Sequence, residues 1–163
     1  MNPYPVRKYH HLKHYDYSQP GFYFVTICAK VRNQNIFSSL LPVGAADPGG
    51  PRLQLTPLGQ IVDQLIQGID CAYPDVHVDQ YIIMPDHVHL LIQLTGDGPP
   101  GSAAPTSLPQ VINALKGFTT RTWGKPVWQD DYYDHILRNP QDLSETRSYI
   151  VQNPSARLER SQT

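Results

Sequence analysis

The sequence predicts an α+β fold: a ferredoxin-like, split βαβ antiparallel sheet with helices on one face, followed by a C-terminal helix. Two observations predict it. Segments rich in β-branched and aromatic residues alternate with segments whose apolar residues recur at helical spacing, in the order β-α-β-β-α-β and then a last helix. The chain has 163 residues, of which 40% are hydrophobic, which is enough for one core. We therefore expect a single domain over residues 1–163, with a basic and aromatic segment at 1–20 and surface loops at 42–52 and 95–107.

The first strand and the first helix have clear local signals. Residues 22–29 (FYFVTICA) are mainly β-branched and aromatic, which favours a strand. Thr56 followed by Pro57 is typical of a helix start, because threonine caps free N–H groups and proline tolerates the first helical position. Tyr73 followed by Pro74 predicts the end of this segment. The expected apolar stripe consists of Leu58, Ile61, Val62, Leu65, Ile66 and Ile69.

The middle of the chain predicts a hairpin, a helix and a fourth strand. Residues 76–84 and 87–94 are expected to be strands joined by a tight turn at 85–86. A second helix should begin near Ser107, and residues 127–137 are mixed enough to predict an irregular strand. The apolar stripe of the second helix is expected to be Val111, Ile112, Leu115 and Phe118.

The last helix is predicted from Asn139-Pro140 to Asn153-Pro154, since a residue before proline is pushed out of helical geometry. The two earlier helices should both cover one face of the sheet, which leaves the other face open for a site.

A pair of histidines is the first candidate for chemistry. His87 and His89 lie two apart in MPDHVHLLI, so both imidazoles project from one face of the strand. Val88, Leu90 and Ile92 point to the opposite face, where the helices pack, and this register places the histidines on the open face. Two imidazoles at this spacing can bind one metal ion. The alternative is a chance H-x-H, because the chain has seven histidines.

The last helix supplies the second candidate. Tyr149 and Asn153 are four residues apart in ETRSYIVQNP and share one helical face, while Leu143, Thr146 and Ile150 mark the buried stripe. Tyr149 could attack phosphorus, and Asn153 could complete a metal site with the histidines. The alternative is that Tyr149 only packs, because the chain has ten tyrosines. Tyr132 and Tyr133 are rival nucleophiles on the same grounds.

The charge distribution gives a weaker signal for a nucleic-acid partner. The net charge of -1 argues against DNA binding, but two stretches are basic and free of acids. Their candidate DNA-binding residues are Arg7, Lys8 and Lys13 in the first stretch and Lys116 and Arg121 in the second. Both stretches could equally be solvated faces. Aromatic residues near the first stretch would suit stacking on unpaired bases, or belong to a flexible N-terminus: Tyr4, Tyr9, Tyr15 and Tyr17.

The cysteines, the apolar runs and the N-terminal histidines indicate the environment in which the protein is expected to lie. Cys28 and Cys71 each lie in an apolar run, so we expect two buried free thiols in a reducing cytoplasm. No apolar run reaches the roughly 18 residues that a membrane span needs, so no membrane association is expected. The histidines near the N-terminus are expected to lie at the surface: His10, His11 and His14.

Five ordered blocks together resemble a known family. These are YDYSQPGFYFVTICA, YIIMPDHVHLLI, LKGFTTR, VWQDDYYDHILRN and SYIVQNP, which cover about residues 15–154. In this order and spacing they are similar to the single-tyrosine HUH transposases, and most similar to the REP-associated tyrosine transposases.

The resemblance implies a specific chemistry. His87 and His89 match the pair that binds a divalent metal, Tyr149 matches the nucleophile, and Asn153 falls where the family completes the metal site. The family uses Mg²⁺ or Mn²⁺ and cuts single-stranded DNA beside a hairpin, which leaves a 5′-phosphotyrosine and a free 3′-hydroxyl. Lys116 and Arg121 lie in a family block, as do His135 and Arg138, to which we assign no catalysis. The resemblance leaves open a homodimer, and whether the tyrosine serves histidines of its own chain or of a partner.

Three other functions remain as alternatives. A non-catalytic module could bind single-stranded or hairpin nucleic acid through exposed aromatics. A metal-dependent hydrolase could use water in place of tyrosine. A domesticated remnant could bind hairpins without cutting them.

Overall fold

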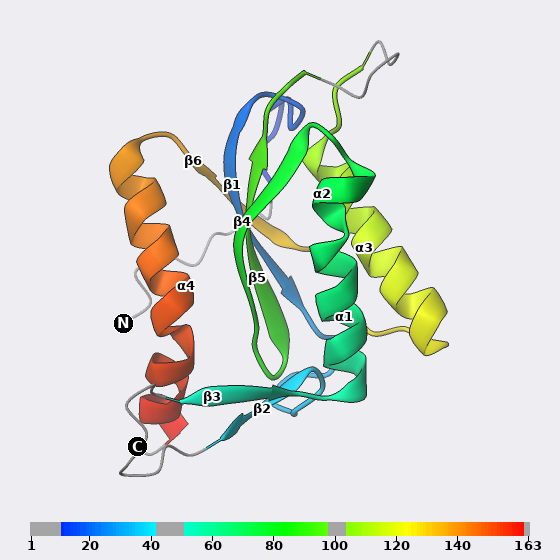
Figure 1. Cartoon of the computed structure of the whole chain (residues 1–163), viewed down its shortest axis with the longest axis vertical. Helices are drawn as coiled ribbons and strands as arrows, with labels where there is room; N and C mark the ends of the chain where they lie inside the picture. The colour runs from blue at the N-terminus through cyan, green and yellow to red at the C-terminus, as the bar shows by residue number, and fades with distance from the viewer. Residues whose placement is uncertain (1–10, 42–50, 98–103, 162–163) are drawn as a thin grey trace.

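The computed structural model describes residues 11–41, 51–97 and 104–161, with side chains placed as far as Arg157. Its centre is a four-stranded antiparallel sheet in the order β4-β5-β1-β6 (Figure 1). The strands are β1 (Gly21–Cys28), β4 (Val76–Ile83), β5 (His87–Leu94) and β6 (Tyr133–Leu137). This strand order is that of the split βαβ sheet and confirms the predicted fold class.

The helices lie on both sides of this sheet. Helices α1 (Pro57–Gln67) and α3 (Leu108–Trp123) cover one face, with the short α2 (Ile69–Ala72) continuing from α1, and α4 (Pro140–Ser161) lies across the other face (Figure 1). The prediction that one face stays open is therefore wrong. The reason is the apolar stripe of α4, where Ile150 packs against Phe24, Leu91 and Leu137 of the sheet.

Local sequence explains where the helices begin. The Thr56 side chain accepts a hydrogen bond from the Gly59 N–H at 3.0 Å, and Ser107 accepts one from Gln110 at 3.4 Å. In α4 the Asn139 side chain accepts one from the Asp142 N–H at 2.8 Å. All three predicted helix starts are confirmed.

The end of α4 differs from the prediction. The helix continues through Pro154 to Ser161, although Pro154 has no N–H to donate to the carbonyl of Ile150, which costs a helix interior about 3 kcal/mol. Tertiary contacts offset that cost. Asn153 and Pro154 are buried, and Arg157 forms an ion pair with Asp86, 71 residues away in sequence.

Three smaller differences concern strands and burial. A separate hairpin of β2 (Ser38–Leu41) and β3 (Arg52–Leu55) was not predicted, because four-residue strands carry too little periodicity. Strand β3 begins at the last residue of the predicted loop at 42–52. Residues 42–50 of that loop lie outside the described part. Of the predicted strand at 127–137, only β6 belongs to the sheet, apart from an isolated bridge between Ala29 and Trp128. Phe118 is exposed, and Thr119 is buried in its place.

The main core lies between the sheet and the α1–α3 layer. It contains Val88, Leu90 and Ile92 from β5 together with Val62 of α1 and Ile112 of α3.

The two cysteines differ in burial. Cys28 is buried, and burial raises the pKa of its thiol, whereas Cys71 is exposed. The prediction of two buried thiols is therefore right for Cys28 and wrong for Cys71. No helix in the described ranges is long and apolar enough to cross a bilayer.

Candidate functional site

The two histidines of β5 face α4. In the β1–β5 pairing, His89 lies opposite Thr26 and His87 lies opposite Cys28, and directly opposed residues share a face of the sheet. Val88 and Leu90, which alternate with them, belong to the main core on the other face. The two imidazole rings have their centroids 4.7 Å apart. The strand register therefore places both imidazoles side by side on the face that α4 covers.

Each imidazole is held through its Nδ1 atom. His87 Nδ1 lies 2.8 Å from the Asp86 carboxylate, and since a carboxylate only accepts, His87 donates. His89 Nδ1 lies 2.9 Å from the Thr26 hydroxyl. Burial lowers the pKa of His87, and burial followed by the charge of His87 lowers the pKa of His89 well below its usual value. Both rings are therefore neutral near pH 7, which is the form that binds metals, with Nε2 as the remaining nitrogen.

Tyr149, on α4, contacts His89. Its ring centroid lies 5.6 Å from that of His89, with the rings tilted by 65°, and 5.9 Å from that of Phe24. The side chain is half-buried, so it is neither sealed in the core nor turned away from the histidines. The tyrosine and the histidines belong to one chain.

Asn153 lies one helical turn after Tyr149 and one turn before Arg157, all on one face of α4. Tyr149 contacts His89, and Arg157 contacts the Asp86 carboxylate that holds His87. Asn153 is therefore positioned between two residues that reach the histidine pair. It is 3% exposed, and its Nδ2 atom has no hydrogen-bond partner among the described residues.

The donor set of these three side chains fits a divalent cation. A buried amide nitrogen without a partner is costly, and the oxygen and nitrogen of an amide can exchange places, so the same side chain can present an oxygen to a ligand. Two imidazole nitrogens and one amide oxygen suit Mn²⁺, accept Zn²⁺ and suit Mg²⁺ less. The described ranges contain no group of three histidine, cysteine or acidic residues placed to bind a metal, so such a site would need the amide.

Asp86 was missed by sequence reasoning, as were its partners Arg32 and Arg157. Its side chain is fully buried, and it also pairs with Arg32 at 3.2 Å and Arg157 at 3.1 Å. The hydrogen bond from His87, followed by a backbone N–H and the Arg32 charge, holds the pKa of Asp86 well below its usual range despite burial. The only sequence signal was the acidic residue directly before His87.

The candidate DNA-binding residues of α3 are not brought to this site. Helix α3 covers the opposite face of the sheet. Lys116 donates to the backbone carbonyl of Asp130 at 3.0 Å, and burial lowers its pKa. Arg121 lies over the Phe118 ring at 4.6 Å. In the first basic stretch Lys13 is exposed, and Arg7 and Lys8 lie outside the described residues.

Of the N-terminal aromatic residues, Tyr15 and Tyr17 make contacts within the protein. The rings of Tyr15 and Tyr17 lie 4.8 Å apart and pack against the core beside Tyr23, and the Tyr17 hydroxyl donates to Asp134 at 3.0 Å. Both rings are half-buried. Tyr4 and Tyr9 lie outside the described residues.

His11 is partly buried, with 34% of its side chain exposed, and it has partners that the sequence did not predict. Its two ring nitrogens contact carboxylates, Nδ1 that of Asp134 at 2.5 Å and Nε2 that of Asp131 at 2.7 Å. Burial disfavours the charged ring, but the two carboxylates outweigh burial and raise the pKa of His11. His14 is exposed, and His10 lies outside the described residues.

Strand alternation separates the rival tyrosines. Tyr132 is 5% exposed and belongs to the main core, and burial raises its pKa, so it lies on the wrong face for this site. Tyr133 pairs with Thr26 and therefore shares the face of the histidines. It is 39% exposed, which makes it a natural comparison for Tyr149.

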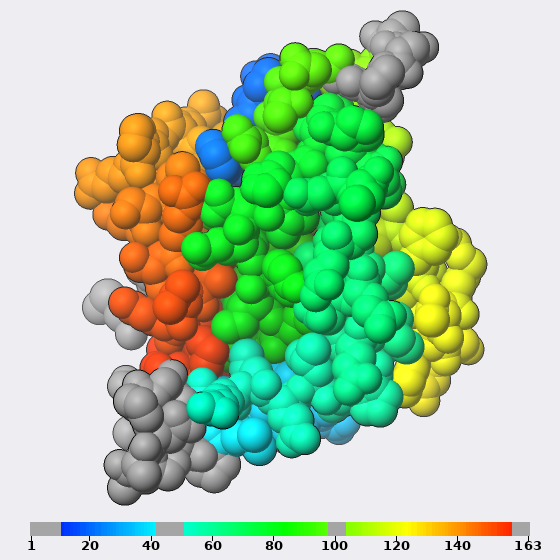
Figure 2. Space-filling view, viewed as in Figure 1, coloured from blue at the N-terminus to red at the C-terminus, as the bar shows by residue number. Residues whose placement is uncertain are grey.

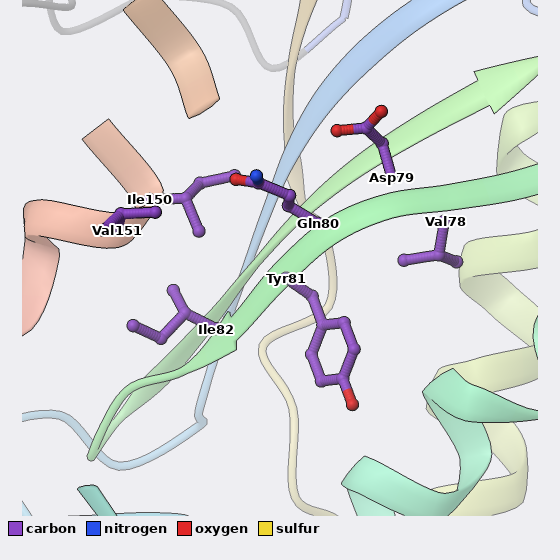
Figure 3. A pocket seen from close by; sticks show the side chains of 7 residues that line it. All are labelled: Val78, Asp79, Gln80, Tyr81, Ile82, Ile150 and Val151. Atoms are coloured by element: carbon purple, nitrogen blue, oxygen red, sulfur yellow. The ribbon is translucent and has the colours of Figure 1, made fainter. Parts of the chain in front are cut away.

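A groove runs beside the site. Helix α4 lies beside strand β4, the edge of the sheet (Figure 2). Between them lies a groove of about 350 Å³ (Figure 3), lined by Val78, Asp79, Gln80, Tyr81, Ile82, Ile150 and Val151. Ile82 pairs with His89, and Ile150 follows Tyr149, so the inner end of the groove adjoins the histidine and tyrosine rings without including them.

Comparison with known proteins identifies the fold. A REP-associated tyrosine transposase bound to a REP hairpin has the same fold, with a TM-score of 0.65 and 20% identity over 90% of this chain and 73% of that one. A candidate transposase of Deinococcus radiodurans aligns with a TM-score of 0.43 and 19% identity over 81% of this chain and 89% of that one, which is too distant to support a conclusion. The fold is thus that of a REP-associated tyrosine transposase, as the sequence blocks predicted.

The sequence comparison gives a nearer relative. An uncharacterised protein of Haemophilus influenzae is 31% identical over an alignment of 163 positions, which covers 88% of this chain and 85% of that one. The chain belongs to the same family as this Haemophilus protein. No family model matches the chain.

Proposed function

We propose that this protein is a transposase-like enzyme that cuts and rejoins single-stranded DNA near hairpins through a 5′-phosphotyrosine at Tyr149. One observation carries the proposal: the Tyr149 ring lies 5.6 Å from the His89 ring, beside His87. The shared fold supports it, because the REP-associated tyrosine transposase of that fold was bound to a hairpin. On this proposal the partner is single-stranded DNA with a hairpin.

In the proposed cleavage step the Tyr149 hydroxyl gives up its proton and its oxygen attacks the scissile phosphorus. The bond from phosphorus to the 3′ oxygen breaks, the 3′ oxygen leaves as a hydroxyl after gaining a proton, and the phosphate stays on the tyrosine. A 3′-hydroxyl later attacks the same phosphorus and releases Tyr149. The number of phosphodiester-type bonds is conserved, so no nucleotide cofactor is needed.

His87, His89 and Asn153 are the residues proposed to hold Mg²⁺ or Mn²⁺. When bound there, a divalent cation would supply positive charge to the scissile phosphate. The protein contributes neutral imidazoles, because burial keeps the pKa values of both histidines low. Helix α4 contributes orientation, because it carries Tyr149 and Asn153 on one face.

The test mixes the protein with Mn²⁺ and labelled hairpin DNA that has single-stranded flanks, and looks for a covalent band on a denaturing gel. Tyr149→Phe should abolish the band and leave DNA binding intact. Tyr133→Phe is the matched control, since Tyr133 is a more exposed tyrosine on the same face, and it should keep the band. Cleavage that survives Tyr149→Phe would instead select a hydrolase that uses water.

One observation favours a second candidate, a non-catalytic module that binds single-stranded or hairpin nucleic acid. Tyr149 packs against Phe24 within the small apolar cluster under α4, which is what a purely structural tyrosine would do. DNA binding without any covalent band in Mg²⁺ or Mn²⁺ would select this candidate.

A further inference from the structure

The Asp86 carboxylate joins three separate segments of the chain. Its side chain is fully buried, takes part in three hydrogen bonds and forms a further ion pair with Arg32. Oδ2 accepts from the backbone N–H of Asn33 at 2.9 Å and contacts Arg32 Nε at 3.2 Å, both in the segment after β1. Oδ1 accepts from His87 Nδ1 at 2.8 Å and from Arg157 Nη1, near the end of α4, at 3.1 Å. A single oxygen atom thus contacts both a histidine of the site and the helix that carries Tyr149.

The contact with His87 determines how that ring is presented. Because Asp86 accepts only, the His87 proton sits on Nδ1 and the lone pair on Nε2. Outer partners of this kind fix the orientation and tautomer of a ligating imidazole.

The contact with Arg157 determines how α4 lies over the strand. Arg157 follows Tyr149 by eight residues, a rise of about 12 Å along the helix, and occupies the same face. On the other side of Tyr149, Arg147 forms a two-point ion pair with Asp79 of β4, at 2.9 Å and 2.7 Å. Tyr149 therefore lies between two arginines of α4 that form ion pairs. Arg157 pairs with Asp86, which contacts His87 of the site, whereas Arg147 pairs with Asp79 of β4.

We propose that Asp86 and Arg157 are positioning residues that act as one unit. Asp86 orients Nε2 of His87 into the site. Arg157 binds the same carboxylate oxygen of Asp86 and sets the position of α4. Asp86 Oδ1 therefore fixes both the His87 ring and the helix that carries Tyr149. The part of this inference that concerns cleavage rests on the proposed function. The position of Tyr149 against the histidines does not depend on that function, and it can be measured without DNA.

The first measurement uses proton NMR of the protein without metal or DNA. The short distance between the Tyr149 and His89 rings should give a cross-peak between their ring protons. Arg157→Gln should weaken or remove this cross-peak, and Arg157→Lys should restore part of it. Arg147→Gln is the matched control, because it breaks an ion pair of α4 with β4 and leaves Asp86 untouched. A cross-peak that persists in Arg157→Gln, or is lost equally in Arg147→Gln, would overturn the inference.

The second measurement separates metal affinity from reaction rate. Asp86→Asn should weaken Mn²⁺ binding, followed by electron paramagnetic resonance, by about 10- to 100-fold. Arg157→Gln should weaken Mn²⁺ binding less than Asp86→Asn does, because it displaces the helix that carries Asn153 but leaves both imidazoles presented, and it should lower the rate of covalent adduct formation about 10-fold, with DNA affinity unchanged. Equal losses of affinity and rate in both variants would contradict the division of roles.

These outcomes are distinguishable from failure of the proposed function. If the unaltered protein forms no adduct, the enzyme proposal fails, but the ring cross-peak and the Mn²⁺ affinity still test the alignment. If Asp86→Asn does not fold, as judged by circular dichroism, the two Arg157 variants with the Arg147→Gln control carry the test alone.

Discussion

Removing the hydroxyl of Thr26 should damage the site through His89. Thr26→Val keeps the β-branched shape that β1 requires and deletes the partner of His89 Nδ1, 2.9 Å away. His89 is 5% exposed, so water cannot easily replace the hydroxyl. A buried polar atom left without a partner costs about 1–3 kcal/mol, and we expect the free energy of unfolding to fall by that amount.

The same substitution should also affect metal binding. Loss of a partner on the second ring nitrogen lowers metal affinity about 10- to 100-fold at other sites, and we expect a loss in that range for Mn²⁺. Stability is measured by urea denaturation with an unchanged m-value, and affinity by Mn²⁺ titration. Thr26→Ser keeps the hydroxyl and is the control. The reasoning is refuted if Thr26→Val matches the unaltered protein, or if serine and valine give the same losses.

Three further predictions concern packing, pH and charge. Ile150→Ala, at a buried position of α4, should lower the free energy of unfolding in urea by about 2–5 kcal/mol. Val151→Ala, at the neighbouring exposed position, should lower it by less than about 0.5 kcal/mol. Similar losses in both variants would mean that α4 does not dock as described. His11 has a pKa raised above 6.5, so its bond to Asp134 stabilises the fold fully below pH 6.5 and less as pH rises through the raised pKa. His11→Gln should flatten that decline in thermal denaturation, and an unchanged slope would exclude His11 as its source. Lys116→Gln should leave adduct yield within about 2-fold, since Lys116 lies on the far face, and a large loss would show that DNA reaches that face.

The sequence predicted the parts of the structure whose signals are local. Strand alternation around Val88 placed His87 and His89 on one face, and the N-caps at Thr56 and Ser107 marked both helix starts within a residue. These features depend on a period of two or on neighbouring residues, so no tertiary information is needed.

The missed features depend on contacts that are distant in sequence. The rule that ends a helix before proline is a local preference, and the buried surroundings of Pro154 together with the pair between Arg157 and Asp86 override it. The same pair makes Asp86 part of the site, and no spacing rule links residues 71 positions apart. The role of His11 was hidden for the same reason, because its partner Asp134 lies 123 residues away.

The most direct measurement identifies the residue that carries DNA after the reaction. The protein is incubated with Mn²⁺ and hairpin DNA, then digested with nuclease and trypsin, and the peptides are analysed by mass spectrometry. The peptide of residues 148–157 should gain the mass of a 5′-linked nucleotide phosphate, with fragment ions that place it on Tyr149. A modification on Tyr133, or cleaved DNA with no modified peptide, would contradict a phosphotyrosine on α4.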